Sequence, residues 1–317
     1  MMRILFAGTP DMAVPSLEAL NECFEVCGVL TNPDKAKGRG RKLHPSPVKA
    51  KALELGIPVL QPEKLNEEAR EEISALKPDV LVCIAYGKIL RQAVLDLFPQ
   101  GAVNLHPSLL PKYRGASPVS EAIKNGDKET AVTIQKMALK MDSGDILFQK
   151  PYLLDGTETT GSFLERVSRD GALYMVEVLT KMEKGELTGI PQDDERATYC
   201  SKVNKEDGLI DWNAPAAEIE RLIRAYSPSP GGFTFWNDQI LFVRKASIDD
   251  LSWKGEGTPH PGQVLGVDKR RGILVQTGDG LICLEELQLQ SRKSLDFKSF
   301  LNGVKDFLDT TLGEVNG

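Results

Sequence analysis

The strongest constraint on the fold is an alternation of apolar runs with amphipathic stretches through the first hundred residues. Residues 3–7 are apolar and end at Gly8, and residues 13–22 then carry apolar side chains at helical spacing. The strand-like and helical stretches repeat in turn at 25–31, 47–56, 57–61, 66–76, 79–86 and 88–98. Almost wholly apolar strands separated by helices are typical of a parallel sheet buried on both faces. We expect an α/β domain whose ligands bind beyond the carboxyl ends of its strands.

The chain is long enough for two domains. Two further strands are predicted at 129–137 and 144–154, and a long helix at 159–185. Residues 191–206 are polar and rich in turn formers, which is typical of a linker. After a helix at 215–226, short strand-like runs separated by Gly-containing turns favour an OB-like β-barrel. We predict a first domain over 1–190, a linker over 191–206 and a second domain over 207–317.

No nucleotide-binding motif is present. The first loop, GTPDM, lacks the spacing of a dinucleotide fingerprint, and no GxxxxGK[ST] sequence occurs. The five cysteines are scattered, without a CxxC pair or a histidine at zinc-ligand spacing. A nucleotide cofactor and a zinc site are therefore not indicated.

One segment reverses the charge of the chain. The formal net charge is -6, which disfavours a general nucleic-acid binder. Against the single acid Asp34, however, residues 31–51 contain seven basic residues: Lys35, Lys37, Arg39, Arg41, Lys42, Lys49 and Lys51. Its Gly and Pro content excludes a continuous helix, so we expect a mobile loop that reaches a polyanion. The alternative is a merely solvated surface loop.

A constellation of polar residues occupies the middle of the chain. Asn104 and His106 are two apart in a predicted strand that breaks at Pro107, so they project from one face near its carboxyl end. Asp142 lies in a Gly-containing turn from which a carboxylate can approach His106. An amide and an imidazole suit the tetrahedral intermediate of acyl transfer. The stretch offers no activated nucleophile, so we expect a substrate, such as an amine, to attack. Singly, each residue could equally be structural.

Two motifs in this region carry a resemblance. NLHPSLLPKYRGASP, followed by TIQKMALKMDSGDIL, resembles the folate-dependent formyltransferases, and the two together are highly specific. The resemblance implies a Rossmann-like parallel-sheet domain, 10-formyltetrahydrofolate as co-substrate and no metal. The catalytic Asn, His and Asp of that family fall on Asn104, His106 and Asp142.

The resemblance also implies a folate site. The SLLP segment of the family, which contacts folate, falls on residues 108–111, and the pterin pocket uses the loops around 84–90 and 137–140. The expected folate-binding residues are Ile84, Tyr86, Gly87, Leu90, Ser108, Leu109, Leu110, Pro111, Met137 and Lys140.

Within the family, three features are similar to the members that formylate methionyl-initiator tRNA for translation initiation. They are AGTPD at the first loop, the inserted basic segment and a C-terminal barrel after IDW. The basic segment is implied to enter the acceptor end of the tRNA. The expected tRNA-binding residues are Arg39, Arg41, Lys42, Lys269, Arg270 and Arg271. The first loop has Met12 where GTPDF is common, which bears on how the methionyl side chain is held.

Two other functions stay open at this point. The first is formylation of a nucleotide-linked aminosugar, and the second is an RNA- or folate-binding module without turnover. The N-terminus has no signal-peptide h-region and no run reaches the length of a membrane span, so we expect a cytoplasmic protein, acting as a monomer.

Overall fold

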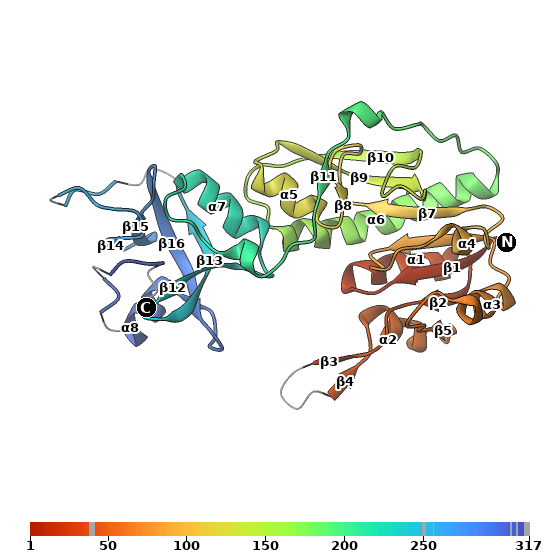
Figure 1. Cartoon of the computed structure of the whole chain (residues 1–317), viewed down its shortest axis with the longest axis horizontal. Coiled ribbons are helices and arrows are strands. Elements are labelled where there is room, and N and C mark those ends of the chain that lie inside the picture. Colours follow the sequence, from red (N-terminus) through yellow and green to blue (C-terminus); the bar gives the residue numbers. More distant parts are fainter. Residues whose placement is uncertain (38–41, 249–251, 256, 305, 309, 314–317) are drawn as a thin grey trace. The chain divides into compact units, whose positions relative to one another are not determined.

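The structure, a computed structural model, describes residues 1–37, 42–248, 252–255, 257–304, 306–308 and 310–313. The chain divides into two compact units (Figure 1). Unit 1 comprises Met1–Pro118, Glu129–Leu153 and Phe163–Cys200. Unit 2 comprises Val119–Lys128, Leu154–Ser162 and Ser201–Gly317. The chain therefore passes between the units several times rather than once.

A seven-stranded sheet of order β10-β9-β7-β6-β1-β2-β5 forms the centre of unit 1. Five strands are parallel: β1 (Arg3–Gly8), β2 (Glu25–Leu30), β5 (Val59–Leu60), β6 (Val80–Ile84) and β7 (Ala102–His106). At one edge β9 (Glu129–Lys136) and β10 (Ile146–Leu153) run antiparallel. The short connection at 137–145 forces β10 to pair antiparallel with β9, because a parallel partner would need a crossover of a dozen residues or more. Within the sheet, β9 is the strand that runs against its neighbour β7. The expected parallel sheet is thus confirmed as a mostly parallel one.

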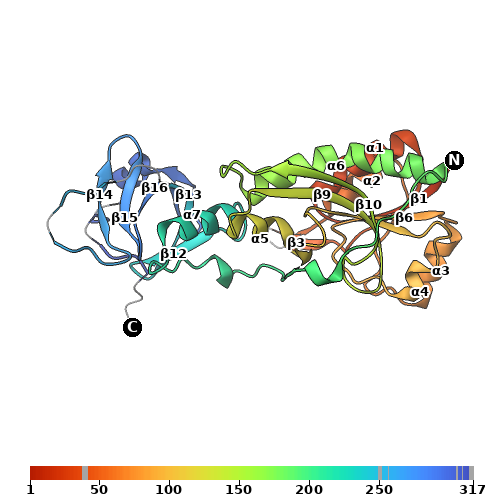
Figure 2. The same ribbon diagram turned by 90° about the horizontal axis from the view of Figure 1, so that it is seen from above.

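Helices cover both faces of this sheet (Figure 2). One face carries α1 (Val14–Cys23), α2 (Pro47–Glu54) and α6 (Thr160–Glu183), and the other carries α3 (Glu67–Ala75) and α4 (Gln92–Leu95). The order of strands reverses direction between β1 and β6, so right-handed crossovers place the helices on opposite faces. At such a switch point a ligand-binding crevice is expected, at the carboxyl ends of β1 and β6.

The helix predicted at 88–98 is mostly a loop. Only α4 is helical, and Arg91, which precedes it, is extended. The apolar spacing that indicated a helix is real, because Leu90, Val94 and Phe98 all lie in one core cluster. The chain before Arg91 instead follows the end of β6, with positive φ at Ala85 and Gly87.

The described parts of the basic segment form strands and a helix rather than the expected loop. Its arms β3 (Lys35–Lys37) and β4 (Lys42–His44) pair antiparallel as a hairpin. Earlier in the chain, a short 3₁₀ helix, η1 (Asp11–Ala13), directly precedes α1. Two of the segment's seven basic residues are instead on α2, where each forms an ion pair. Lys49 Nζ lies 2.8 Å from Asp34, and Lys51 Nζ lies 2.9 Å from Glu18.

Part of the predicted linker is built into unit 1. The 3₁₀ turn η2 (Asp194–Arg196) leads to β11 (Tyr199–Cys200), which pairs in parallel with β8 (Arg114–Gly115). This segment therefore lies beside the end of the His106 loop. The predicted division at 191–206 stays a prediction, although Phe163–Cys200 clusters with unit 1.

Unit 2 holds antiparallel strands around its own core. Its elements are α5 (Pro118–Lys124, of which 119–124 belong to this unit), η3 (Glu206–Gly208), α7 (Ala216–Ala225), β12 (Gly232–Trp236), β13 (Gln239–Ser247), β14 (Val264–Asp268), β15 (Gly272–Gln276), β16 (Leu281–Leu289), β17 (Leu295–Asp296) and α8 (Phe297–Gly303). The sheet order is β12-β13-β16-β15-β14, with β17 on β16. A cluster that includes Trp212, Ile223, Leu241 and Phe300 fills the core. Among the described residues, no helix combines the length and apolarity of a membrane span.

Candidate active site

Asn104 and His106 occupy the carboxyl end of β7, as the sequence predicted. β7 lies between β6 and β9, with Asn104 opposite Cys83 and Gln135, and His106 opposite Thr133. Pro107 follows at once, so the strand ends where a side chain can face the crevice. His106 is 3% exposed, whereas Asn104 is half-buried. The amide of Asn104 is therefore the more accessible of the two groups.

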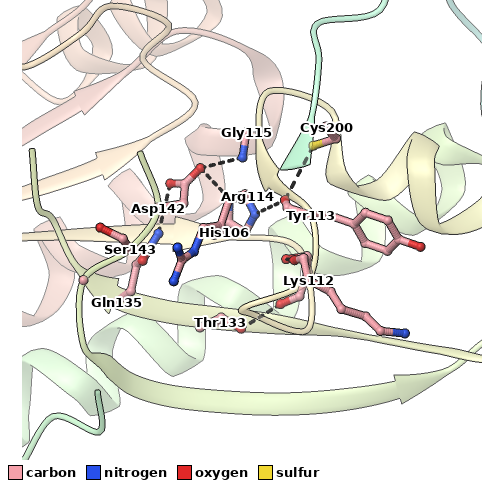
Figure 3. Close-up of polar contacts among 12 residues, drawn as sticks. His106, Lys112, Tyr113, Arg114, Gly115, Thr133, Gln135, Asp142, Ser143 and Cys200 are labelled. Carbon is pink, nitrogen blue, oxygen red and sulfur yellow. Dashed lines mark hydrogen bonds and ion pairs between the residues drawn. The ribbon is translucent and has the colours of Figure 1, made fainter. Parts of the chain in front are cut away.

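Both ring nitrogens of His106 face acceptors (Figure 3). Nε2 lies 2.9 Å from the carbonyl oxygen of Tyr113, which can only accept, so Nε2 carries a proton and donates it. Nδ1 lies 3.6 Å from Oδ2 of Asp142, beyond hydrogen-bond distance. Burial lowers the pKa of His106, opposed by the Asp142 charge and the Tyr113 carbonyl. The neutral ring is therefore favoured, with Nδ1 as its basic nitrogen.

Two donors fix the carboxylate of Asp142. Its Oδ2 accepts from the backbone N–H of Gly115 at 2.9 Å, and its Oδ1 accepts from Nε2 of Gln135 at 3.0 Å (Figure 3). Asp142 has φ of +49°, a left-handed conformation that Asp tolerates better than most residues. The MDSGD turn thus aims the carboxylate back at β7.

Two glycines permit this arrangement. Gly115 has φ of +125°, and a Cβ there would collide with the carbonyl oxygen of Cys200. A Cβ at Gly144 would collide with the carbonyl oxygen of Lys136. Any other residue at either position would displace a segment that holds Asp142. The glycines of the YRG and DSG motifs therefore have a direct steric reason.

Sequence reasoning missed the residues behind this pair. Gln192 comes from the segment predicted as a linker, and its Nε2 donates to the carbonyl of Asp142 at 2.9 Å, the carbonyl of Gly144 at 2.7 Å and Oε1 of Gln135 at 3.1 Å. Its Oε1 accepts from Nε and Nη2 of Arg114. The one available signal in the sequence was Arg114, a charged residue between Tyr113 and Gly115. Gln192 had none, because a polar residue in a polar stretch is unremarkable.

The predicted folate loop at 84–90 exposes backbone rather than its named side chains. Ile84, Tyr86 and Leu90 are each at most 6% exposed. The carbonyl of Tyr86 accepts from Nδ2 of Asn32 at 2.6 Å and from the hydroxyl of Thr9 at 3.1 Å. Gly87 is exposed, and Ile89, which was not among the expected folate-binding residues, is 81% exposed. Only the backbone and alternate residues of this loop can meet a ligand.

The SLLP segment is likewise held by hydrogen bonds to its backbone carbonyls. The carbonyl of Ser108 accepts from Thr133 at 2.7 Å, and the carbonyl of Leu110 accepts from Gln149 at 3.1 Å. Ser108 and Leu110 are buried, whereas Leu109 and Pro111 are half-buried. The segment therefore offers Leu109 and Pro111 at the surface.

The turn before Asp142 carries the two remaining predicted folate residues. Met137 packs partly buried against the core, and Lys140 is exposed, with its Nζ 2.8 Å from Asp194. That ion pair raises the pKa of Lys140 and lowers that of Asp194. Leu139 and Met141, on either side of Lys140, are 67% and 55% exposed. An apolar surface thus lies beside the carboxylate.

The predicted tRNA-binding residues are spread over both units. Arg39 and Arg41 lie outside the described residues, and Lys42 begins β4 of the hairpin. Lys269, Arg270 and Arg271 are exposed at the turn between β14 and β15, where Oδ1 of Asp268 accepts from the backbone N–H of Arg270 at 2.8 Å.

Comparison with known proteins identifies the relatives of this chain. The formyl transferase family model matches residues 2–179, and the model for the formyl transferase C-terminal domain matches residues 202–305. The methionyl-tRNA formyltransferase of Treponema denticola is 45% identical over 317 residues, covering 97% of this chain and 98% of that protein. The chain belongs to the methionyl-tRNA formyltransferase family. The family member from Chloroflexus aurantiacus is 46% identical over 305 residues, covering 96% of this chain and 97% of its own.

Solved structures share the fold at lower identity. WlaRD, a sugar 3N-formyltransferase crystallised with dTDP and 5-N-formyl-THF, has a TM-score of 0.66 and 18% identity, covering 92% of this chain and 99% of its own. Identity that low shows the fold alone. The two methionyl-tRNA formyltransferases from Treponema denticola and Chloroflexus aurantiacus, at 45% and 46% identity, are far more similar in sequence, so the aminosugar alternative is not supported.

Proposed function

We propose that this chain transfers the formyl group of 10-formyltetrahydrofolate to the free amino group of methionyl-initiator tRNA. Membership of the family supports the reaction, and the placement of Asn104 and the His106–Asp142 pair at the carboxyl end of β7 supports the site. The placement of these residues carries the proposal, because it puts an amide donor and a proton acceptor at the end of one strand.

The chemistry balances without a protein nucleophile. The amino nitrogen of the methionyl group forms a bond to the formyl carbon, and the bond from that carbon to N10 of the folate breaks. One proton leaves the amine and one proton arrives at N10, so the products are N-formylmethionyl-tRNA and tetrahydrofolate. The chain has to stabilise an oxyanion on the formyl group and move a proton.

Asn104 and His106 divide these two tasks. The half-buried amide of Asn104 is free to donate toward the oxyanion. Nε2 of His106 donates to Tyr113 in this conformation, so Nδ1 is the site that takes the proton from the amine. Asp142 faces Nδ1 and stabilises the imidazolium that results. The ring therefore acts mainly as an acid–base group, beside the oxyanion contact expected from the sequence.

The residues around the crevice fit a folate. The exposed residues Ala85, Gly87 and Ile89 offer backbone amide and carbonyl groups for the polar edge of a pterin, and the apolar side chains of Ile89, Leu139 and Met141 offer surface to its rings. We propose that Leu109 and Pro111 border the same site, whereas Ile84, Tyr86, Ser108, Leu110 and Leu90 support it from the core.

The hairpin is the proposed guide for the tRNA. Lys35, Lys37 and Lys42 lie on its two strands, and Arg39 and Arg41 lie outside the described residues. Phosphate contacts by such residues position a nucleic acid without reading its bases. We propose a lesser contact at Lys269, Arg270 and Arg271.

Formyl transfer from radiolabelled 10-formyltetrahydrofolate tests the proposal. With methionyl-initiator tRNA as acceptor the label should enter the aminoacyl-tRNA, and with a nucleotide-linked aminosugar it should not. Uncharged tRNA is the control for the amino group. Label on the aminosugar, or none on either acceptor, would overturn the proposal. The monomeric state and cytoplasmic location stay predictions.

A further inference from the structure

A chain of side-chain amides runs from the buried Arg114 to Asp142 within unit 1. The side chain of Arg114 is 0% exposed, and its Nη1 lies 2.7 Å from Asp194. Its Nε and Nη2 lie 3.1 and 2.9 Å from Oε1 of Gln192. Gln192 in turn contacts Gln135, and Gln135 contacts Asp142. Four residues far apart in the sequence thus form one continuous series.

The polarity of this series is fixed by its first member. A guanidinium has only donors, so the group of Gln192 that faces Arg114 must be its oxygen. Nε2 of Gln192 then faces Gln135 and must meet its oxygen, Oε1. Nε2 of Gln135 is left to face Oδ1 of Asp142, which accepts at 3.0 Å. Reversing either amide would set donor against donor.

The same Gln192 amide also holds the backbone of the turn. It donates to the carbonyls of Asp142 and Gly144 at 2.9 and 2.7 Å. Asp142 is therefore fixed at its side chain through Gln135 and at its main chain through Gln192. Gln192 is half-buried, and the two hydrogens of its Nε2 are shared among Oε1 of Gln135 and the two carbonyls. A connected polar network of this kind restricts each member to one arrangement.

We propose that Arg114 and Gln192 are positioning residues for the formyl transfer: acting through Gln135, they orient the carboxylate of Asp142 toward Nδ1 of His106. The proposal rests on the proposed function of Asp142. It makes the segment after residue 190 part of the catalytic unit, although that segment touches no reacting group.

The variant Gln192→Glu separates positioning from anchoring. A glutamate keeps the shape and still accepts from Arg114, so the segment stays attached to unit 1. It loses the donor, so its second oxygen faces the oxygen of Gln135 and two carbonyls, and the series is broken beyond Arg114. We expect kcat for methionyl-tRNA to fall at least about tenfold, and up to about 100-fold, as for other small misplacements of reacting groups. KM for the tRNA and tetrahydrofolate affinity should be unchanged, whereas Tm should fall modestly, because two backbone carbonyls lose their donor.

Glu195→Gln is the matched control, because it makes the opposite exchange at an exposed position on the same segment and should leave kcat unchanged. Wild-type kcat in Gln192→Glu would overturn the proposal. A parallel loss of tetrahydrofolate affinity would also overturn it, since it would show that the variant disturbs the whole site and not Asp142 alone.

A double-mutant cycle tests the order of the series. Gln135→Met removes the donor to Asp142 while keeping a side chain of similar length. If the residues act in series, Gln135→Met with Gln192→Glu should be no slower than Gln135→Met alone, whereas multiplied losses would refute a single series.

Nitrogen NMR of the imidazoles gives a readout that does not depend on turnover. The chain has three histidines, so the signals of His106 can be assigned by one substitution. Gln192→Glu should shift the Nδ1 signal of His106, and Glu195→Gln should not. An inactive wild type would count against the proposed function, and an unmoved Nδ1 signal would count against the positioning role.

Discussion

Nδ1 of His106 stands 3.6 Å from Oδ2 of Asp142, close enough for charge interaction and too far for a hydrogen bond. The neutral ring thus has an open basic nitrogen facing an anion. Once Nδ1 takes a proton, the pair can close to a charge-assisted hydrogen bond. This geometry is that of a neutral histidine whose Nδ1 can accept a proton.

Removing the imidazole tests this role. His106→Ala should lower kcat by about 100- to 10,000-fold, the usual contribution of a general acid–base group. Tetrahydrofolate binding, measured by calorimetry, should survive, because the proposed folate contacts come from other loops. Near wild-type turnover would eliminate His106 from the reaction.

The protonation of His106 has a predictable sign. Burial lowers its pKa, so its titration midpoint in the free enzyme should lie below the ordinary value of 6.5. Because the Asp142 charge opposes that effect, Asp142→Asn should move the midpoint lower still. Imidazole NMR over a pH series measures both. A wild-type midpoint above 6.5, or an upward shift in Asp142→Asn, would contradict the assignment.

The basic hairpin should govern the salt dependence of tRNA binding. Replacing Arg39, Arg41 and Lys42 with glutamine should raise KM for the tRNA. It should also reduce the magnitude of the slope of log affinity against log salt concentration by about 2 to 3, because each phosphate contact contributes roughly 0.7–0.9 to that slope. Tetrahydrofolate affinity should not change.

The control for that experiment removes the same charge on or beside α6, at Arg169, Lys181 and Lys184. It should leave the salt slope close to that of the wild type. An unchanged slope in the hairpin variant would show that the hairpin is not the anchor.

The base of the hairpin offers a test in which two effects have opposite signs. Asp34 accepts twice from Lys49, at 2.9 and 2.8 Å, and once from Gln61 at 2.9 Å. Asp34→Asn adds net positive charge, which by itself would tighten tRNA binding, but it breaks the anchor. We expect KM for the tRNA to rise. Glu54→Gln makes the same charge change on α2 away from Asp34, and a fall in KM for both variants would mean that charge alone matters.

Gly115 should be intolerant of a side chain. Gly115→Ala places a Cβ against the carbonyl of Cys200 at φ of +125° and disturbs the N–H that binds Asp142. We expect a loss of about 1–3 kcal/mol in the free energy of unfolding, together with reduced kcat. Gly185→Ala, at φ of +71° with open space around it, controls for backbone strain and should cost less. Equal losses in denaturant unfolding would dismiss the clash.

Local pattern predicted much of this molecule. The mostly parallel sheet followed from apolar runs alternating with helical stretches, and Asn104 and His106 followed from their spacing before Pro107. Where the local pattern gave a wrong prediction, packing into the core decided the conformation. The helix expected at 88–98 gave way because Leu90 and Val94 reach the same core from a loop and a short helix, which periodicity alone cannot distinguish from one continuous helix.

The sequence by itself determined the strand ends, the turn at Asp142 and the basic segment, because each is encoded within a few neighbouring residues. Tertiary structure alone decided how Asp142 is held. Gly115 meets it across 27 positions and Gln192 across 50, and Gln192 meets Arg114 across 78. Those contacts depend on the parallel pairing of β8 with β11, and a short pair of strands between a loop and an apparent linker leaves no periodic trace in the sequence.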